Sequence, residues 1–213
     1  SGPIAVESRV TEGGITVFRF GTEAGITVPA VLFDTTSGSD GALIVYCHED
    51  GFHAESRGAG IIAKLRAAGH RILAFDPRGV GLTRGDAHGW WGNSTKPHFE
   101  WLRKDGSFEA GVILGFNDPS YEGPMATECE HTWTARMLGR PLLGQRVLDV
   151  LRVLGALDSV TSSTQGRVVL MGSGIGALGA LYASPFAAKQ VAGLILHAPL
   201  ASARRCAHRH RHG

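Results

Sequence analysis

The sequence predicts an α/β fold in which helices flank a mostly parallel sheet. Residues 43–47 and 71–75 are apolar without polar alternation, which is typical of strands buried on both faces of a parallel sheet. Segments with helical spacing separate the predicted strands, and this alternation favours an open sheet with its ligand site at the carboxyl ends of the strands. The chain has 213 residues, 43% of them hydrophobic and 19% charged, as expected of one globular domain with a substantial core.

The elements can be placed one after another along the chain. Residues 15–20 and 26–33 alternate apolar and polar side chains around a turn at Glu23, which predicts an antiparallel pair as the first two strands. Residues 80–130 are irregular and rich in Gly, Asp, Asn, Pro and aromatic residues, which favours a lid or a wrapping loop. The remaining predicted elements are helices at 58–68, 131–138, 142–157 and 175–183, and strands at 168–171 and 191–196.

Charge and composition exclude several classes of protein. A formal net charge of +2 is too small to argue for a nucleic-acid partner. The longest apolar runs have the length of strands, far short of a membrane span, and no signal-like segment follows Ser1. Three cysteines without framework spacing indicate a reducing compartment. We therefore expect a cytoplasmic protein with neither a nucleic-acid nor a membrane partner.

Residues 167–178 (RVVLMGSGIGAL) read as a strand that turns sharply into a helix. In this small-x-nucleophile-x-small motif the small residues are Gly172 and Gly176, and the turn presents the side chain between them. That position is Gly174, so the motif lacks its nucleophile. Ser173 lies one place too early, and a shift of one residue sends a side chain to the opposite face of a strand. Ser173 remains an irregular alternative nucleophile, for which we expect no base within the fold.

Four segments together resemble the α/β-hydrolase superfamily, and within it the acetyl-xylan-esterase-like branch. They are residues 45–51 (VYCHEDG), 68–81 (AGHRILAFDPRGVG), 138–152 (LGRPLLGQRVLDVLR) and the turn around Gly174. The resemblance covers roughly residues 15–200 and implies an α/β-hydrolase-like sheet, with a serine nucleophile and with an acid and a histidine on two later strands.

The chain departs from this family pattern in two respects. Gly174 stands where the serine belongs, and the sequence ends just past the strand at 191–196, before the acid and the histidine. We therefore expect a truncated α/β-hydrolase domain over residues 1–202, lacking the last strands. The Arg/His-rich tail at 203–213 does not resemble the family.

Histidines at the ends of two predicted strands indicate a candidate metal site. His48 and His197 would lie about 10 Å apart between backbones, two strand positions along the sheet. Asp50 and His53 follow His48 in the same loop. We expect these four residues to bind zinc or another divalent metal, with an open position for water. The alternative is that His48 and Asp50 shape the loop and His197 caps its strand.

The backbone N–H groups of Ile175 and Gly51 are candidate oxyanion-hole donors, because such a hole needs no particular side chain. The leading hypothesis is that a metal-activated water hydrolyses small-molecule carboxylic or phosphate esters. One alternative is a catalytically silent fragment that self-associates. Another is a serine esterase that uses Ser173.

Other features are expected to serve structure or assembly. The strand at 191–196 would be an apolar sheet edge without charges, which favours a homodimer through this strand and the tail. Asp76 is expected to tie its turn by hydrogen bonds, and Cys47 to be an inert buried thiol with a raised pKa. The ECEH cluster at 128–131 is expected to interact with a helix dipole rather than a metal.

Overall fold

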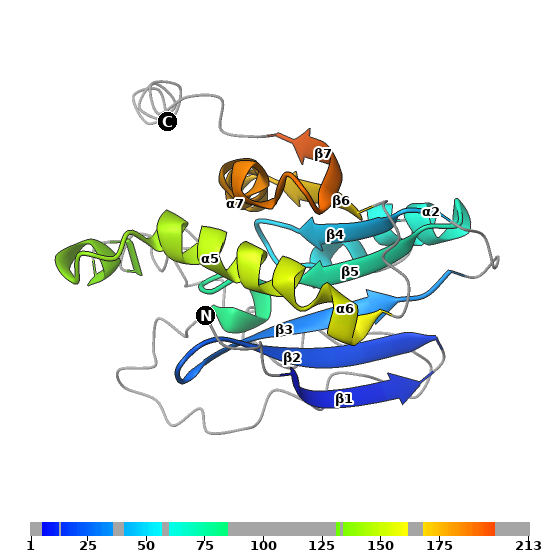
Figure 1. The fold of residues 1–213 in the computed structure, drawn as a ribbon, viewed down its shortest axis with the longest axis horizontal. Coiled ribbons are helices and arrows are strands. Elements are labelled where there is room, and N and C mark those ends of the chain that lie inside the picture. The colour runs from blue at the N-terminus through cyan, green and yellow to red at the C-terminus, as the bar shows by residue number, and fades with distance from the viewer. Residues whose placement is uncertain are drawn as a thin grey trace, which may run out of the picture.

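The structure is a computed structural model that describes residues 6–12, 14–35, 41–56, 60–84, 131–132, 134–161 and 168–198. In this part of the chain, seven strands form one sheet in the order β1-β2-β3-β5-β4-β6-β7 (Figure 1). The strands are β1 (Val6–Glu12), β2 (Ile15–Glu23), β3 (Ile26–Phe33), β4 (Leu43–Cys47), β5 (Arg71–Phe75), β6 (Val168–Ser173) and β7 (Val191–His197). The first three strands and β5 pair antiparallel, whereas β5, β4, β6 and β7 run parallel. The predicted α/β fold, with an antiparallel pair early in the chain and parallel strands after it, is confirmed.

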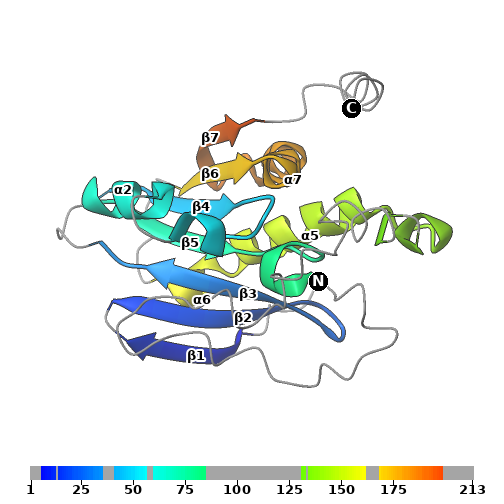
Figure 2. The same ribbon diagram turned by 180° about the vertical axis from the view of Figure 1, so that it is seen from behind.

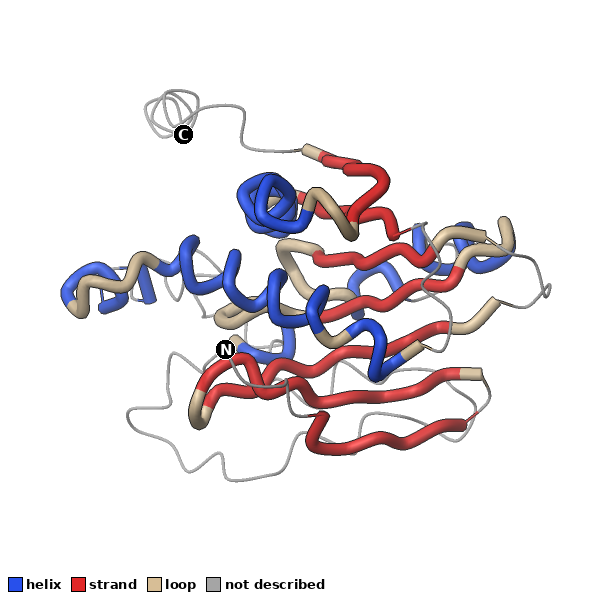
Figure 3. Tube along the Cα trace, viewed as in Figure 1, coloured by secondary structure: helices blue, strands red, loops and turns tan. Residues whose placement is uncertain are grey.

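Helices cover both faces of the sheet and make a three-layer domain. Figure 1 shows α5, α6 and α7 in front of the sheet, and Figure 2 shows α2 on the other side. The tube in Figure 3 makes the same separation visible, with helices in blue and strands in red. The helical elements are α1 (His53–Ser56), α2 (Ile61–Ala67), η1 (Gly81–Thr83), α5 (Leu142–Gly155), α6 (Leu157–Val160), α7 (Ile175–Ala183) and η2 (Ser184–Ala187).

Each face of the sheet has its own hydrophobic core. Alternate residues of β4 point to opposite faces, so Val45 packs towards α5 and α7 while Ile44 packs towards α2. Leu170 and Leu154 are buried in the first core, and Phe52 in the second. A strand with both faces covered needs apolar residues at every position, which explains why Leu43–Cys47 is buried throughout.

The sequence missed or merged several elements. Strand β1 precedes the strand that was predicted to be first, and its sequence VESRVTE has too few apolar residues to signal a strand. The predicted helix at 142–157 is divided into α5 and α6 at Ala156, whose φ is −96° and ψ −3°. The short helix α1 was not predicted. Most of the predicted lid, residues 85–130, and the tail at 203–213 lie outside the described residues.

The sheet ends at β7, which pairs with β6 alone among the described strands. Two large apolar side chains of this strand are exposed, Leu194 at 36% and Ile195 at 47%. The expectation of an apolar edge strand is therefore confirmed for the described part of the chain. Within that part, no helix is both long enough and apolar enough to cross a bilayer.

Candidate active site

The turn between β6 and α7 has the conformation that the sequence motif demands. Gly174 adopts φ 55° and ψ −120°, a region that residues with side chains rarely enter. A Cβ on Gly176 would lie 2.4 Å from the Cys47 carbonyl oxygen, and one on Gly172 would lie 2.5 Å from the carbonyl oxygen of Gly176. These two glycines let α7 pack directly against β4 and β6. The sharp turn therefore persists although its central residue has no side chain.

A carboxylate fills the space in front of Gly174. A Cβ on Gly174 would lie 2.0 Å from Glu49 Oε2 and 2.2 Å from Glu49 Cδ. Glu49 comes from the loop that follows β4, and its side chain is half-buried. The Glu49 side chain was not predicted to take part in the site. Glu49 lies between His48 and Asp50 in the sequence, but only the packing of β4 beside β6 brings its carboxylate to the turn.

Ser173 and His197 are partners in neighbouring strands. They are paired in the β6–β7 register, and Ser173 Oγ lies 3.2 Å from His197 Nδ1. The Gly174 N–H also donates to the His197 carbonyl oxygen at 3.1 Å. The expectation that no base accompanies Ser173 is wrong, because register places an imidazole beside its hydroxyl. Ser173 itself is only 3% exposed.

His48 is held by its own loop and by the helix that follows. Its Nδ1 accepts a hydrogen bond from the Asp50 N–H at 3.1 Å, and its Nε2 lies 4.0 Å from Glu55 Oε1. The Gly51 N–H donates to the His48 carbonyl oxygen at 3.2 Å, which closes a tight turn. The predicted oxyanion donor at Gly51 is therefore engaged within the loop. Ile175 begins α7, where an N–H has no partner inside the helix.

The four predicted metal ligands are not assembled into one cluster. Among the described residues, no group of three or more His, Cys, Asp or Glu side chains could hold a metal ion. His53 begins α1, and His48 and His197 make the separate contacts described above. Zinc or another divalent metal at these residues stays a prediction.

Asp76 ties together two loops beneath the site. Its Oδ1 accepts the Phe52 N–H and its Oδ2 accepts the Leu82 N–H, both at 2.8 Å. The carboxyl group is fully buried, and this burial raises its pKa to about 7 although both hydrogen bonds oppose the shift. The predicted structural role of Asp76 is supported by these contacts.

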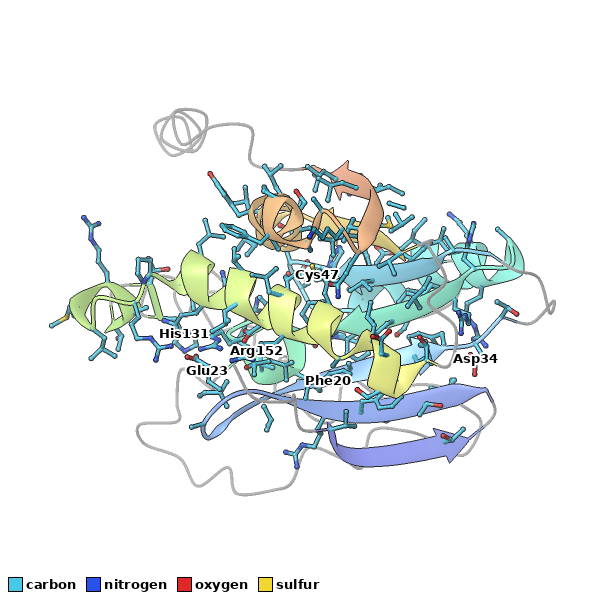
Figure 4. The ribbon with its side chains drawn as sticks, in the orientation of Figure 1. Phe20, Glu23, Asp34, Cys47, His131 and Arg152 are labelled. Atoms are coloured by element: carbon cyan, nitrogen blue, oxygen red, sulfur yellow. The ribbon has the colours of Figure 1, made fainter. Side chains whose placement is uncertain are left out.

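A buried ion pair fixes the turn after β5 to helix α5. Arg78 donates to both carboxylate oxygens of Asp149, through Nε at 2.9 Å and Nη2 at 2.6 Å. Its Nη1 reaches Glu23 at 2.6 Å and Gln145 at 2.9 Å. The hydrogen bond from Arg78 is the main cause that holds the pKa of Glu23 below its ordinary value. Figure 4 labels Glu23 beside α5, at this junction of the sheet and the helix layer.

Cys47 lies at the end of β4, inside the layer between the sheet and α7 (Figure 4). Its thiol donates to the Gly176 carbonyl oxygen at 3.3 Å. Burial raises the pKa of the Cys47 thiol to about 12, so the group is protonated at neutral pH. The predicted burial of Cys47 is confirmed, and its lack of reactivity stays a prediction.

Comparison with known proteins places the fold in a class. No family model and no curated protein sequence matches the chain. Solved structures do match, and those described below share an α/β-hydrolase-like fold with this chain. A Bacteroides fragilis protein provisionally assigned as an acetyl xylan esterase is 12% identical with a TM-score of 0.59, and covers 91% of this chain.

Two further matches are acetyl xylan esterases of bacteria. Acetyl xylan esterase 1 from Thermoanaerobacterium and the enzyme from Paenibacillus sp. R4 are each 18% identical, with a TM-score of 0.52, and cover 99% of this chain. The chain spans 47% of the Bacteroides protein and 57% of the other two, about half of their length. At these identities the likeness establishes an α/β-hydrolase-like fold, which confirms the resemblance found in the sequence.

Proposed function

We propose that this protein hydrolyses esters of small carboxylic acids, with water as the attacking nucleophile. The observation that carries this proposal is the turn at Gly174, which keeps the backbone of a nucleophile position without a side chain to form a covalent intermediate. The fold-level likeness to acetyl xylan esterases supports esters as the substrate class. Phosphate esters are the second substrate class predicted from the sequence.

The proposed reaction uses the N-terminus of α7. As the ester carbonyl carbon changes to a tetrahedral centre, negative charge develops on its oxygen. The Ile175 N–H points out of the first turn of a nine-residue helix, where the helix dipole also favours negative charge. Loss of one such donor typically lowers kcat by about 100-fold to 1000-fold.

The metal-activated form of the reaction belongs to this proposal as well. It requires His48, Asp50, His53 and His197, which the structure does not bring into one cluster, to close around zinc or another divalent ion that would supply an activated water. The test is turnover of p-nitrophenyl acetate and p-nitrophenyl phosphate before chelation, after chelation, and after zinc is restored. Loss and recovery of turnover support the metal. Turnover that is unchanged by the chelator excludes the metal-activated reaction. If neither ester is turned over, the proposed function itself is contradicted.

Ser173 is a second candidate nucleophile, favoured by its 3.2 Å hydrogen bond to His197. A serine that is activated by an imidazole reacts with fluorophosphonates and forms an acyl-enzyme. Mass spectrometry after fluorophosphonate treatment therefore separates this mechanism from water attack. Labelling of Ser173, with loss of turnover in Ser173→Ala, would establish the serine mechanism. An unlabelled Ser173 favours water.

The competing proposal is that the protein has no catalytic activity and self-associates through β7. It is supported by the unpaired edge of β7 in the described chain and by exposed Leu194 and Ile195. Light scattering of the full chain measures its mass. A dimer that becomes a monomer in Ile195→Lys supports the edge contact, and a monomeric wild type contradicts it.

A further inference from the structure

The Glu49 carboxylate occupies the place from which a nucleophile side chain would project. All three of its terminal heavy atoms, Oε2, Cδ and Oε1, lie within 2.8 Å of the position of a Cβ on Gly174. The turn at Gly174 has no side chain of its own, and the loop after β4 places the Glu49 carboxylate in front of it instead. This placement depends on Gly174, because any side chain there would displace the carboxylate.

The loop that carries Glu49 is fixed on both sides. Before it, β4 is hydrogen-bonded into the middle of the sheet between β5 and β6. After it, the Asp50 and Gly51 N–H groups both return to His48, and the Phe52 N–H is held by buried Asp76. A side chain on such a short constrained loop keeps a defined position, as a catalytic group requires.

A carboxylate beside the start of α7 could simply be a partner for the helix dipole, a role worth about 0.3–1 kcal/mol. That role would need only a negative charge near the helix. It would not need the conformation of Gly174 or the tight contacts of Gly172 and Gly176 that create the turn. What points to chemistry is that a turn which only glycine adopts readily coincides with a carboxylate placed directly in front of it.

We propose that Glu49 is the general base of the ester hydrolysis proposed above, and the inference rests on that function. The Glu49 carboxylate takes a proton from water while the water oxygen bonds to the ester carbonyl carbon. The carbonyl electron pair moves to the oxygen near the Ile175 N–H. The carbonyl then re-forms, the bond to the alkoxy oxygen breaks, and Glu49 returns its proton to the departing alcohol. One ester and one water give one acid and one alcohol.

The experiment compares four forms of the full chain for turnover of p-nitrophenyl acetate: wild type, Glu49→Gln, Glu49→Gly and Asp158→Asn. Glu49→Gln keeps the size of the side chain and removes its basicity, and we expect kcat to fall about 100-fold or more with little change in KM. Glu49→Gly leaves room for a small carboxylate, and added formate is expected to recover at least about tenfold of the lost rate. Asp158 is exposed on α6, far from the turn, so Asp158→Asn is the charge-matched control.

The outcomes separate this inference from the function on which it rests. If the kcat of Glu49→Gln stays within about threefold of wild type, Glu49 is not the general base, and the proposed hydrolase activity is unaffected. A second outcome is that turnover falls in Glu49→Gln but formate does not restore it in Glu49→Gly, although both variants unfold in urea like wild type. That result also contradicts a general base and assigns Glu49 a structural role. A wild type without turnover overturns the hydrolase and the base together.

Discussion

Helix α7 contains two glycines three residues apart, and we expect opposite effects when each is replaced by alanine. In an exposed or loosely packed helix this change stabilises a protein by about 1 kcal/mol, because glycine has the poorer helix propensity. At Gly176, however, the new Cβ would lie 2.4 Å from the Cys47 carbonyl oxygen and 2.7 Å from the Cys47 carbonyl carbon. Ordinary contact begins at 3.4 Å, so helix and strand would have to separate by about 1 Å.

The separation is costly because both sides of the contact are backbone and neither can rotate away. Overpacking of this kind typically costs about 1–3 kcal/mol, and it would also weaken the 3.3 Å hydrogen bond from Cys47 to Gly176. We expect Gly176→Ala to lower the free energy of unfolding by up to about 2 kcal/mol once the propensity gain of about 1 kcal/mol is subtracted.

Gly179 on the same helix is the matched control. A Cβ there would meet Val150 Cγ2 at 3.6 Å, an ordinary contact. Gly179→Ala should therefore raise the free energy of unfolding by about 1 kcal/mol. Urea unfolding followed by far-UV circular dichroism measures both variants against wild type. If Gly176→Ala is stabilised as much as Gly179→Ala, α7 does not approach β4 as closely as the structure shows, and the reasoning fails.

Three further predictions concern groups beneath the site. Asp149→Asn breaks the buried pair with Arg78 and should lower the free energy of unfolding in urea by about 3–5 kcal/mol. Glu23→Gln, which removes the more exposed partner of the same arginine, should lower it by less than about 1 kcal/mol. Equal losses in the two variants would contradict a larger contribution from the buried pair. The pKa of Asp76 is raised from 3.8 to about 7, so the folded protein keeps a proton that the unfolded chain releases. The stability that this proton contributes is present below pH 3.8 and is lost as pH rises through about 7, and Asp76→Asn should flatten the measured slope of unfolding free energy over that window. Cys47 should resist iodoacetamide at pH 8 in the folded protein and react fully in urea, which peptide mass spectrometry reports; rapid modification of the folded chain would contradict its burial.

Local patterns in the sequence were sufficient for much of the fold. The uninterrupted apolar runs at β4 and β5 signalled strands covered on both faces, and the structure buries all of β4. The glycines at 172, 174 and 176 signalled the turn into α7 because close approach and a positive φ both restrict the residue type. Strand β1 was missed because its sequence shows little apolar alternation, whereas its pairing with β2 depends on tertiary structure.

The residues of the candidate site were harder to predict, because their roles depend on register and loop direction. Ser173 was an alternative nucleophile for which no base was expected, yet parallel pairing of β6 and β7 places His197 beside it. His48, which the sequence predicts as a metal ligand, contacts its own loop and Glu55, and these contacts could not be read from its position along the chain. A spacing of histidines along the chain does not reveal which way each imidazole turns.

The sequence by itself determined the class of fold and the loss of the nucleophile at Gly174, since hydrophobic period and the identity of one residue are local properties of the chain. Only the tertiary structure decided which side chain occupies the space in front of Gly174. Glu49 and Gly174 are far apart in sequence and meet because β4 and β6 are neighbours in the sheet, so their contact follows from strand order and loop geometry and from no pattern along the chain.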